Sequence, residues 1–143
     1  MITGHDKNFY KENLMDKKKI LIVEDDRDIA KGLSLRLEAN GYATASASDA
    51  HSAIDAASKE KPDMILLDLG LPDENGFVMM ENLQRNPSLS SVPVIVLTGR
   101  PQEVYKEATE LAGAKAYLQK PVENEELLAA IRRVLPPGLT QSQ

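Results

Sequence analysis

Cysteine is absent from this chain, and aromatic residues make up only 4% of its 143 residues. The lack of cysteine excludes disulfides, thiol catalysis and thiolate metal sites. With so few aromatic side chains, the core must be built from Leu, Ile, Val, Ala and Met. Long apolar runs are absent too, because stretches such as residues 20–23 and 94–97 fall far short of the ~20 residues that a bilayer-spanning helix needs. We therefore expect no transmembrane segment and no membrane partner.

An excess of positive charge is also missing, since 17 Lys and Arg stand against 22 Asp and Glu, a formal net charge of -5. Non-specific binding to nucleic acid needs a basic face, so this balance argues against a direct nucleic-acid partner. The first residues are polar and charged and do not form the positive flank and apolar stretch of a secretory signal. The composition therefore predicts a globular protein with a cytoplasmic location.

The chain is long enough for one domain with a single core. Residues 1–17 show no sustained apolar period, and we interpret them as a flexible N-terminal arm. Proline and glycine followed by polar residues indicate a C-terminal tail or the start of a linker over residues 137–143. Residues 18–136 are then the folded domain.

Within this domain, five short apolar runs alternate with five segments of helical period. The predicted strands cover residues 19–23, 42–47, 63–68, 93–98 and 115–119. The predicted helices cover residues 26–39, 49–60, 76–85, 101–112 and the segment around 127–135. In the fourth of these helices, we expect the buried stripe to consist of Val104, Ala108, Leu111 and Ala112.

The alternation of strands and helices predicts an α/β fold with a parallel sheet covered on both faces. The runs ILIV, MILL and VIVL are apolar throughout, as is typical of strands that are buried on both faces. Right-handed crossover connections limit the topology to a few doubly wound orders. In such folds, ligands bind beyond the carboxyl ends of the strands.

Polar residues follow four of the five predicted strands. Glu24 and Asp25 follow the first strand, and Asp68 ends the third. Thr98 ends the fourth strand, and Lys120 follows the fifth. Because the carboxyl ends of parallel strands meet at one edge of the sheet, we expect these side chains to gather there. The second strand ends in the small residues Ala47 and Ser48, which should leave that part of the edge open.

Crowded carboxylates raise one another's pKa values, so they stay ionised together only if a cation holds them. All the expected ligands are oxygens, which suits a hard cation such as Mg²⁺ and does not suit zinc. Carboxylates, a divalent cation, a lysine and a hydroxyl together suit a phosphoryl group. A carboxylate that attacks phosphorus forms an acyl phosphate, and Asp68 is the candidate nucleophile.

Four motifs, ILIVEDD, MILLDLGLPDENG, VIVLTG and AYLQKP, occur in this order, each at the end of a predicted strand. Together they resemble the receiver domain of two-component response regulators, of the chemotaxis-regulator type. The resemblance covers roughly residues 18–136. It implies a flavodoxin-like, doubly wound, five-stranded parallel sheet in the order 2-1-3-4-5 with five helices.

The resemblance also implies a function in phosphorelay signalling. A sensor histidine kinase or a histidine phosphotransfer protein would donate the phosphoryl group, with Mg²⁺ as the cofactor. The domain would be a switch that assists its own phosphorylation and dephosphorylation, and so not an enzyme in the usual sense. It would bind a downstream output protein or domain through its fourth helix, fifth strand and fifth helix, at about residues 101–135.

Particular residues acquire roles through this resemblance. Glu24 and Asp25 match the acidic pair that holds the metal. Asp68 matches the phosphoacceptor and a further metal ligand, and Gly70 would add its backbone carbonyl. Thr98 matches the hydroxyl residue that binds a phosphate oxygen.

The remaining matches lie in the second half of the chain. Lys120 matches the lysine that pairs with the phosphate, and its bond to Pro121 is typically cis in this family. Tyr117 matches an aromatic switch that turns inward when the nearby Thr98 moves. The resemblance suggests that the positions of Gly70 and Arg100 tune phosphate loss, but Arg100 could equally be an ordinary solvated side chain.

Other interpretations remain open for these residues. Asp68 taken alone could be an ordinary turn residue, and Asp26 is best explained as an acid at a helix N-terminus. His5 and His51 have no partner pattern and are expected at the surface. A Mg²⁺-dependent phosphatase of the haloacid dehalogenase type is one alternative, although Gly70 stands where that family requires a second aspartate. A degenerate receiver that only binds proteins is the other.

Overall fold

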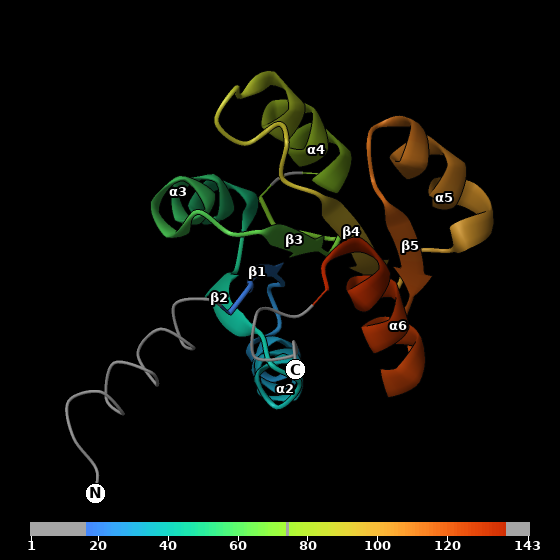
Figure 1. Cartoon of the computed structure of the whole chain (residues 1–143). Coiled ribbons are helices and arrows are strands. Elements are labelled where there is room, and N and C mark those ends of the chain that lie inside the picture. The colour runs from blue at the N-terminus through green and yellow to red at the C-terminus, as the bar shows by residue number, and fades with distance from the viewer. Residues whose placement is uncertain (1–16, 74, 137–143) are drawn as a thin grey trace, which may run out of the picture.

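The computed structural model describes residues 17–73 and 75–136, in which five strands alternate with five helices (Figure 1). The strands are β1 (Lys19–Val23), β2 (Ala43–Ala47), β3 (Met64–Leu67), β4 (Val94–Thr98) and β5 (Ala116–Gln119). The helices are α2 (Arg27–Glu38), α3 (Ala50–Glu60), α4 (Gly76–Arg85), α5 (Gln102–Leu111) and α6 (Asn124–Val134). The predicted tail and all but the last residue of the predicted arm lie outside the described residues, so the domain boundaries stay predictions.

The strands form one parallel sheet in the order β2-β1-β3-β4-β5, which confirms the predicted fold class. The register aligns the strand ends at the carboxyl edge. Val23, the last residue of β1, pairs with Ala47 of β2 and with Leu67 of β3. The residues that follow β1 and β3 therefore begin at the same level of the sheet.

Helices cover both faces of the sheet. Figure 1 shows α3, α4 and α5 on one face and α2 and α6 on the other. Alternate residues of β1 separate accordingly: Leu21 and Val23 belong to the first core cluster, and Ile20 and Ile22 belong to the second. Successive side chains of a strand point to opposite faces, so a strand covered on both sides must be apolar at every position. This explains the uninterrupted apolar runs.

Side chains at the carboxyl edge fix the starts of two helices. Asp26 caps α2, because its Oδ1 accepts hydrogen bonds from the N–H groups of Asp28 (2.9 Å) and Ile29 (3.1 Å). This agrees with the interpretation of Asp26 as a helix-start acid. Asp73, in the loop after β3, accepts hydrogen bonds from the N–H groups of Ala50 and His51 at the start of α3. These bonds tie the β3–α4 loop to the neighbouring helix.

The predicted buried stripe of α5 is wrong at three of its four positions. Val104 and Leu111 are 66% and 83% exposed, and Ala108 is exposed as well. The covered side consists of Tyr105, Thr109 and Ala112, of which only Ala112 was predicted. Both sets of residues have helical spacing, and they differ by one position, which is a rotation of about 100°.

Two contacts explain why the helix adopts this rotation. The Tyr105 ring packs against Phe77 of α4, with ring centroids 5.9 Å apart. The Thr109 hydroxyl donates to the carbonyl of Lys106 at 2.9 Å, so this polar side chain can be buried without losing a hydrogen bond. In α2, Ile29 is 40% exposed, and the adjacent Ala30 occupies the buried position.

None of the helices in the described part of the chain has the length and apolar character needed to cross a bilayer.

A substitution at Gly76 tests how closely the start of α4 packs against Leu69. A Cβ at this position would lie 2.7 Å from the Cα and 2.8 Å from the Cδ2 of Leu69. We therefore expect Gly76→Ala to lower the free energy of unfolding by about 1–3 kcal/mol, measured by urea denaturation. Gly32, inside α2, is the matched control because a Cβ there has no neighbour within 4 Å. Gly32→Ala should raise the free energy of unfolding by about 0.5–1 kcal/mol. Equal stability of Gly76→Ala and the parent would contradict this account of the loop.

Candidate functional site

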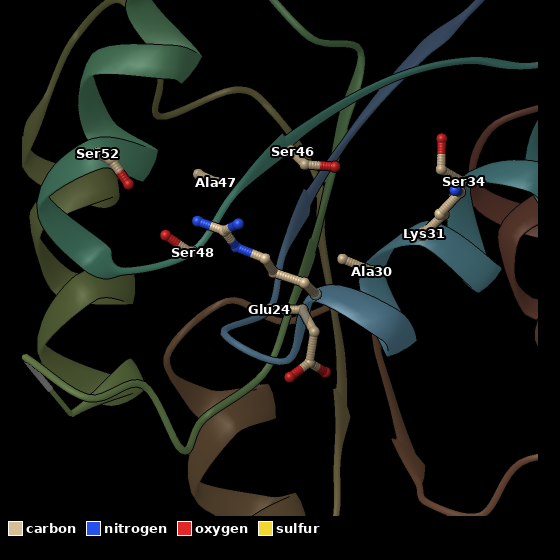
Figure 2. Close-up of a pocket in the computed structure, with 9 residues that line it drawn as sticks. Glu24, Ala30, Lys31, Ser34, Ser46, Ala47, Ser48 and Ser52 are labelled. Atoms are coloured by element: carbon tan, nitrogen blue, oxygen red, sulfur yellow. The ribbon is translucent and has the colours of Figure 1, made fainter.

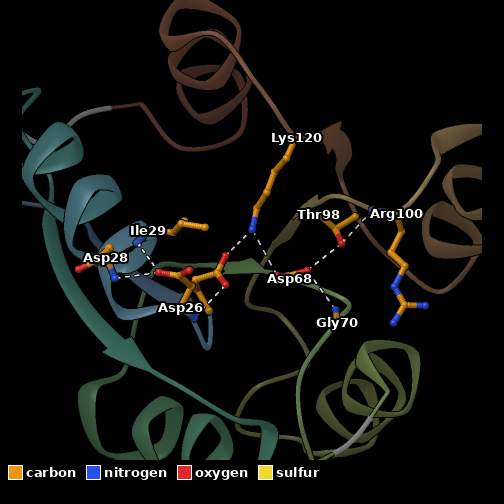
Figure 3. A network of polar contacts seen from close by, with 9 residues as sticks. Asp26, Asp28, Ile29, Asp68, Gly70, Thr98, Arg100 and Lys120 are labelled. Carbon is orange, nitrogen blue, oxygen red and sulfur yellow. Dashed lines mark hydrogen bonds and ion pairs between the residues drawn. The ribbon is translucent and has the colours of Figure 1, made fainter.

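The polar residues predicted from the sequence come together at the carboxyl edge of the sheet (Figure 3). Glu24 and Asp25 directly follow β1, and Asp68 follows β3. Each of these three acids offers a carboxylate oxygen within 4.8 Å of the others. The parallel register produces this convergence, because β1 and β3 end at paired residues.

Asp68 is the centre of the hydrogen-bond network. Its Oδ1 accepts hydrogen bonds from the Thr98 hydroxyl at 2.7 Å and from the Gly70 N–H at 3.0 Å. Its Oδ2 lies 3.3 Å from the Lys120 ammonium nitrogen. Both oxygens therefore have partners from other strand ends or from the following loop.

Lys120 joins two of the acids. Its Nζ donates to Glu24 Oε1 at 2.5 Å as well as to Asp68 Oδ2. Glu24 is only 5% exposed, and its Oε2 accepts a hydrogen bond from the Asp26 N–H at 3.2 Å. A buried carboxylate without such partners would be strongly unfavourable, so these bonds make the position of Glu24 possible.

The surroundings shift the pKa values of the three groups in different directions. Burial alone raises the pKa of Asp68, but the Gly70 N–H, the Thr98 hydroxyl and the Lys120 ammonium together bring it below its ordinary value. Burial raises the pKa of Glu24, and the bond from Lys120 only partly offsets this. Burial lowers the pKa of Lys120, but Glu24 and Asp68 together raise it above its ordinary value. Asp68 is therefore ionised and Lys120 protonated at neutral pH.

The pKa shifts agree with the expectation that crowded carboxylates raise one another's pKa values and stay ionised together only when a positive charge holds them. The charge of Asp68 raises the pKa of Glu24. At Asp68, the Lys120 ammonium and the hydrogen bonds from Gly70 and Thr98 outweigh the effect of burial on the pKa and keep the carboxylate ionised. For Glu24, burial is the largest cause of the raised pKa, and the charge of Asp68 is the smallest of the causes.

The donor set of the acidic cluster fits a hard divalent cation. Glu24, Asp25 and Asp68 provide carboxylate oxygens only, which matches the preference of Mg²⁺ and does not favour zinc. Gly70 lies beside the cluster, where a Cβ would be 3.7 Å from Asp68 Oδ1. The contact between the Gly70 carbonyl and a metal ion stays a prediction.

Tyr117 and Arg100 lie next to the network. Tyr117 is buried, and its hydroxyl donates to the Arg100 carbonyl at 2.7 Å. The Arg100 N–H lies 3.4 Å from the Thr98 hydroxyl oxygen, and its exposed side chain extends over the Tyr105 ring at 5.7 Å. The Lys120–Pro121 peptide bond is cis, as the family resemblance implied.

The contacts of Tyr105 with Arg100 and Phe77 were not predicted from the sequence. The Tyr105 hydroxyl lies 3.4 Å from Arg100 Nη1, and its ring packs on Phe77. The only signal in the sequence was the spacing of Tyr105 and Thr109, which competed with the more apolar stripe one position earlier. His51 is exposed beside Asp55, in line with its interpretation as a surface residue. His5 lies outside the described residues.

A cavity of about 580 Å³ opens on the other side of Glu24 (Figure 2). It lies between α2 and α3 at the end of β2, and Ala30, Lys31, Ala47 and Ser48 are among the residues that line it. This agrees with the expectation that the small residues after the second strand leave the edge open. The cavity borders the acidic cluster through Glu24.

Comparisons with known proteins agree with this geometry. The family model of the response regulator receiver domain matches residues 20–132. Protein PilH of Pseudomonas aeruginosa is 37% identical over 117 residues, which cover 82% of this chain and 97% of PilH. The haloacid dehalogenase alternative is not favoured, since the matching family is the receiver domain.

Two solved structures show the same fold. The chemotaxis protein CheY4 of Vibrio cholerae has a TM-score of 0.77 and 30% identity over 82% of this chain and 98% of its own. The receiver domain of sensor histidine kinase PA1611 from P. aeruginosa has a TM-score of 0.74 and 28% identity over 82% of this chain and 96% of its own. That receiver holds a magnesium ion coordinated in its active-site cleft.

Other curated relatives are longer. The chain spans about half the length of the transcriptional regulators that it matches, such as KdpE of Escherichia coli, of which it covers 50% at 41% identity. The family match covers most of the present chain, and PilH matches over nearly its own full length. The chain therefore belongs to the receiver domain family of two-component response regulators.

Proposed function

We propose that this receiver accepts a phosphoryl group from a phosphohistidine onto Asp68 and thereby switches its binding of an output partner. The observation that carries the proposal is the set of contacts around Asp68. A hydroxyl, a backbone N–H and an ammonium reach one ionised carboxylate, with two further acids beside it. If Asp68 only stabilised a turn, it would not need the hydrogen bonds from Thr98 and Lys120, which belong to the ends of other strands.

In the proposed transfer, a carboxylate oxygen of Asp68 attacks the phosphorus of the donor. The new O–P bond forms as the N–P bond to the donor imidazole breaks, and the imidazole keeps the electron pair and is protonated by solvent. The lowered pKa of Asp68 keeps the nucleophile ionised. The Lys120 ammonium, 3.3 Å from Asp68, is placed to neutralise negative charge on the transferred oxygens.

Glu24, Asp25 and Asp68 are the residues that would hold Mg²⁺, with the Gly70 carbonyl as a further ligand. When bound, Mg²⁺ would neutralise charge on the phosphoryl oxygens. The oxygen-only donor set supports this assignment. The magnesium-bound receiver of PA1611 is a structural relative that supports it as well.

Thr98 and Tyr117 are the proposed switch. Once Asp68 carries a phosphoryl group, the Thr98 hydroxyl would donate to a phosphoryl oxygen in place of Asp68 Oδ1. Arg100, whose N–H contacts Thr98 and whose carbonyl binds Tyr117, connects the two residues. Because Tyr117 is already buried, phosphorylation would act by stabilising this arrangement, as a shift of population between two existing states.

The partners in this proposal are a sensor histidine kinase or a histidine phosphotransfer protein and a downstream output protein or domain. Output would be transmitted through α5, β5 and α6. The proposal includes a cytoplasmic location and a phosphoprotein state. It also treats the domain as a switch that assists its own phosphorylation and dephosphorylation. The degenerate-receiver alternative is less well supported, because all the acids, Thr98 and Lys120 are present and lie close together.

Asp68→Asn is the direct test of the nucleophile. We expect incubation with acetyl phosphate and Mg²⁺ to label the parent and leave Asp68→Asn unlabelled, because an amide cannot form the acyl phosphate. Labelling is measured by intact-protein mass spectrometry. Asp26→Asn is the matched control, because asparagine also caps helices well and Asp26 makes no bond to Asp68, Thr98 or Lys120. Labelling of Asp68→Asn at the parent's level would rule out Asp68 as the phosphoacceptor.

Asp25→Asn tests the metal assignment separately. Asp25 is exposed, so its replacement should leave the fold unchanged while it removes one carboxylate from the cluster. We expect Mg²⁺ to bind at least about tenfold more weakly, which is about 1.4 kcal/mol. Isothermal titration calorimetry measures the affinity, again with Asp26→Asn as the control. An unchanged affinity in Asp25→Asn would exclude it from the metal site.

A further inference from the structure

The exposed side of α5 carries an apolar stripe that the fold leaves uncovered. Val104, Ala108 and Leu111 follow one another at intervals of four and three residues, so they share one side of the helix. Val104 is 66% exposed and Leu111 is 83% exposed, the two largest values among the large apolar residues of the described chain. Exposed apolar residues are ordinary when they are single, but a continuous stripe is typical of an interaction site.

A pocket continues this stripe toward α4. Leu111 lines a cavity of about 340 Å³ together with Glu81, Gln84 and Arg85 of α4. At the other end of the two helices, Phe77 packs against Tyr105. The two helices are thus in aromatic contact at their starts, and the cavity lies toward their ends. We use the name α4–α5 groove for this cavity together with the exposed stripe of Val104, Ala108 and Leu111 beside it.

Negative charge borders the groove. Each residue of the apolar stripe is preceded by an exposed glutamate: Glu103, Glu107 and Glu110. The apolar stripe therefore lies between the buried side of α5 and this acidic side. Glu81 adds a further carboxylate from the α4 wall, although Arg85 supplies one positive charge beside it.

We propose that the α4–α5 groove binds an amphipathic helical segment of the output partner that has an apolar face flanked by Lys or Arg. Apolar anchors would cover the stripe and enter the cavity beside Leu111, and basic residues would lie along the glutamates. A second copy of this chain fits less well, because each copy has a net charge of -5 and a symmetric contact would bring the glutamates together. The inference rests on the proposed function in taking the partner to be the output partner, and it extends the proposed output surface of α5, β5 and α6 to the α4 side of α5.

Peptide binding tests the groove. The probes are a fluorescein-labelled amphipathic helical peptide of leucine and lysine and a peptide of the same pattern in leucine and glutamate. We expect the lysine peptide to bind the parent with a clear preference over the glutamate peptide, by fluorescence anisotropy. The double variant Val104→Ser/Leu111→Ser should weaken binding of the lysine peptide at least about tenfold, since buried apolar anchors dominate such interfaces. Glu107→Gln/Glu110→Gln should weaken it as well.

Leu35→Ser is the matched control, because Leu35 is a 59% exposed leucine on α2, which covers the opposite face of the sheet. It should bind the lysine peptide as the parent does. Unchanged binding by the Val104/Leu111 variant, or equal binding of the two peptides, overturns the proposal. A parent dimer in sedimentation velocity that the same variant abolishes also overturns it, because the occupant would then be a second copy.

Labelling of the same samples by acetyl phosphate separates this inference from the proposed function. The groove variants should label at the parent's level, which also shows that they are folded. If the parent is labelled normally but does not bind the lysine peptide, the proposed groove is wrong and the proposed function is unaffected. Absence of labelling in the parent with normal peptide binding contradicts the proposed function alone.

Discussion

The bond network between Lys120 and the two carboxylates of Glu24 and Asp68 is the constraint on which the site depends. Lys120 follows β5, at one side of the sheet, and its ammonium reaches the acids that follow β3 and β1. Glu24 is almost fully buried, so an ammonium or another strong donor is needed to compensate its charge. The same ammonium helps to keep Asp68 ionised. One side chain thus stabilises the edge of the sheet and prepares the proposed nucleophile.

The groups around Asp68 also explain how a small chemical change could reach a distant surface. Thr98 donates to Asp68, Arg100 contacts Thr98 through its N–H, and its carbonyl binds Tyr117. The side chain of Arg100 then lies over Tyr105, which starts the buried side of α5. These contacts connect Asp68, the proposed phosphoacceptor, with the helix whose exposed side carries the apolar stripe. A redistribution of hydrogen bonds at Asp68 would therefore bias the start of α5.

Much of the fold could be predicted from the sequence because β1, β3 and β4 are covered on both faces. Such strands must be apolar at every position, and the polar residue after each run marks its carboxyl end. The convergence of Asp68, Thr98 and Lys120 followed from the rule that parallel strands end at one edge. Their individual roles came only from the resemblance of the four motifs to receiver domains.

Two features could not be predicted, for physical reasons. The rotation of α5 depends on Phe77 of α4, which packs against Tyr105, and helical spacing alone fits two stripes equally well. The lowered pKa of Asp68 depends also on the Gly70 N–H, whose hydrogen bond to the Asp68 side chain no motif indicates. Charge counting along the chain detects the acids but not the geometry of the donors.

The most direct measurement of the central claim is a crystal structure of the chain with Mg²⁺ and beryllofluoride, which imitates an acyl phosphate. The account predicts beryllium bonded to an oxygen of Asp68, with the Thr98 hydroxyl and the Lys120 ammonium contacting its fluorides. Mg²⁺ should lie among Glu24, Asp25 and Asp68. Beryllofluoride bound at another residue, or Lys120 turned away from a beryllofluoride on Asp68, would contradict the account.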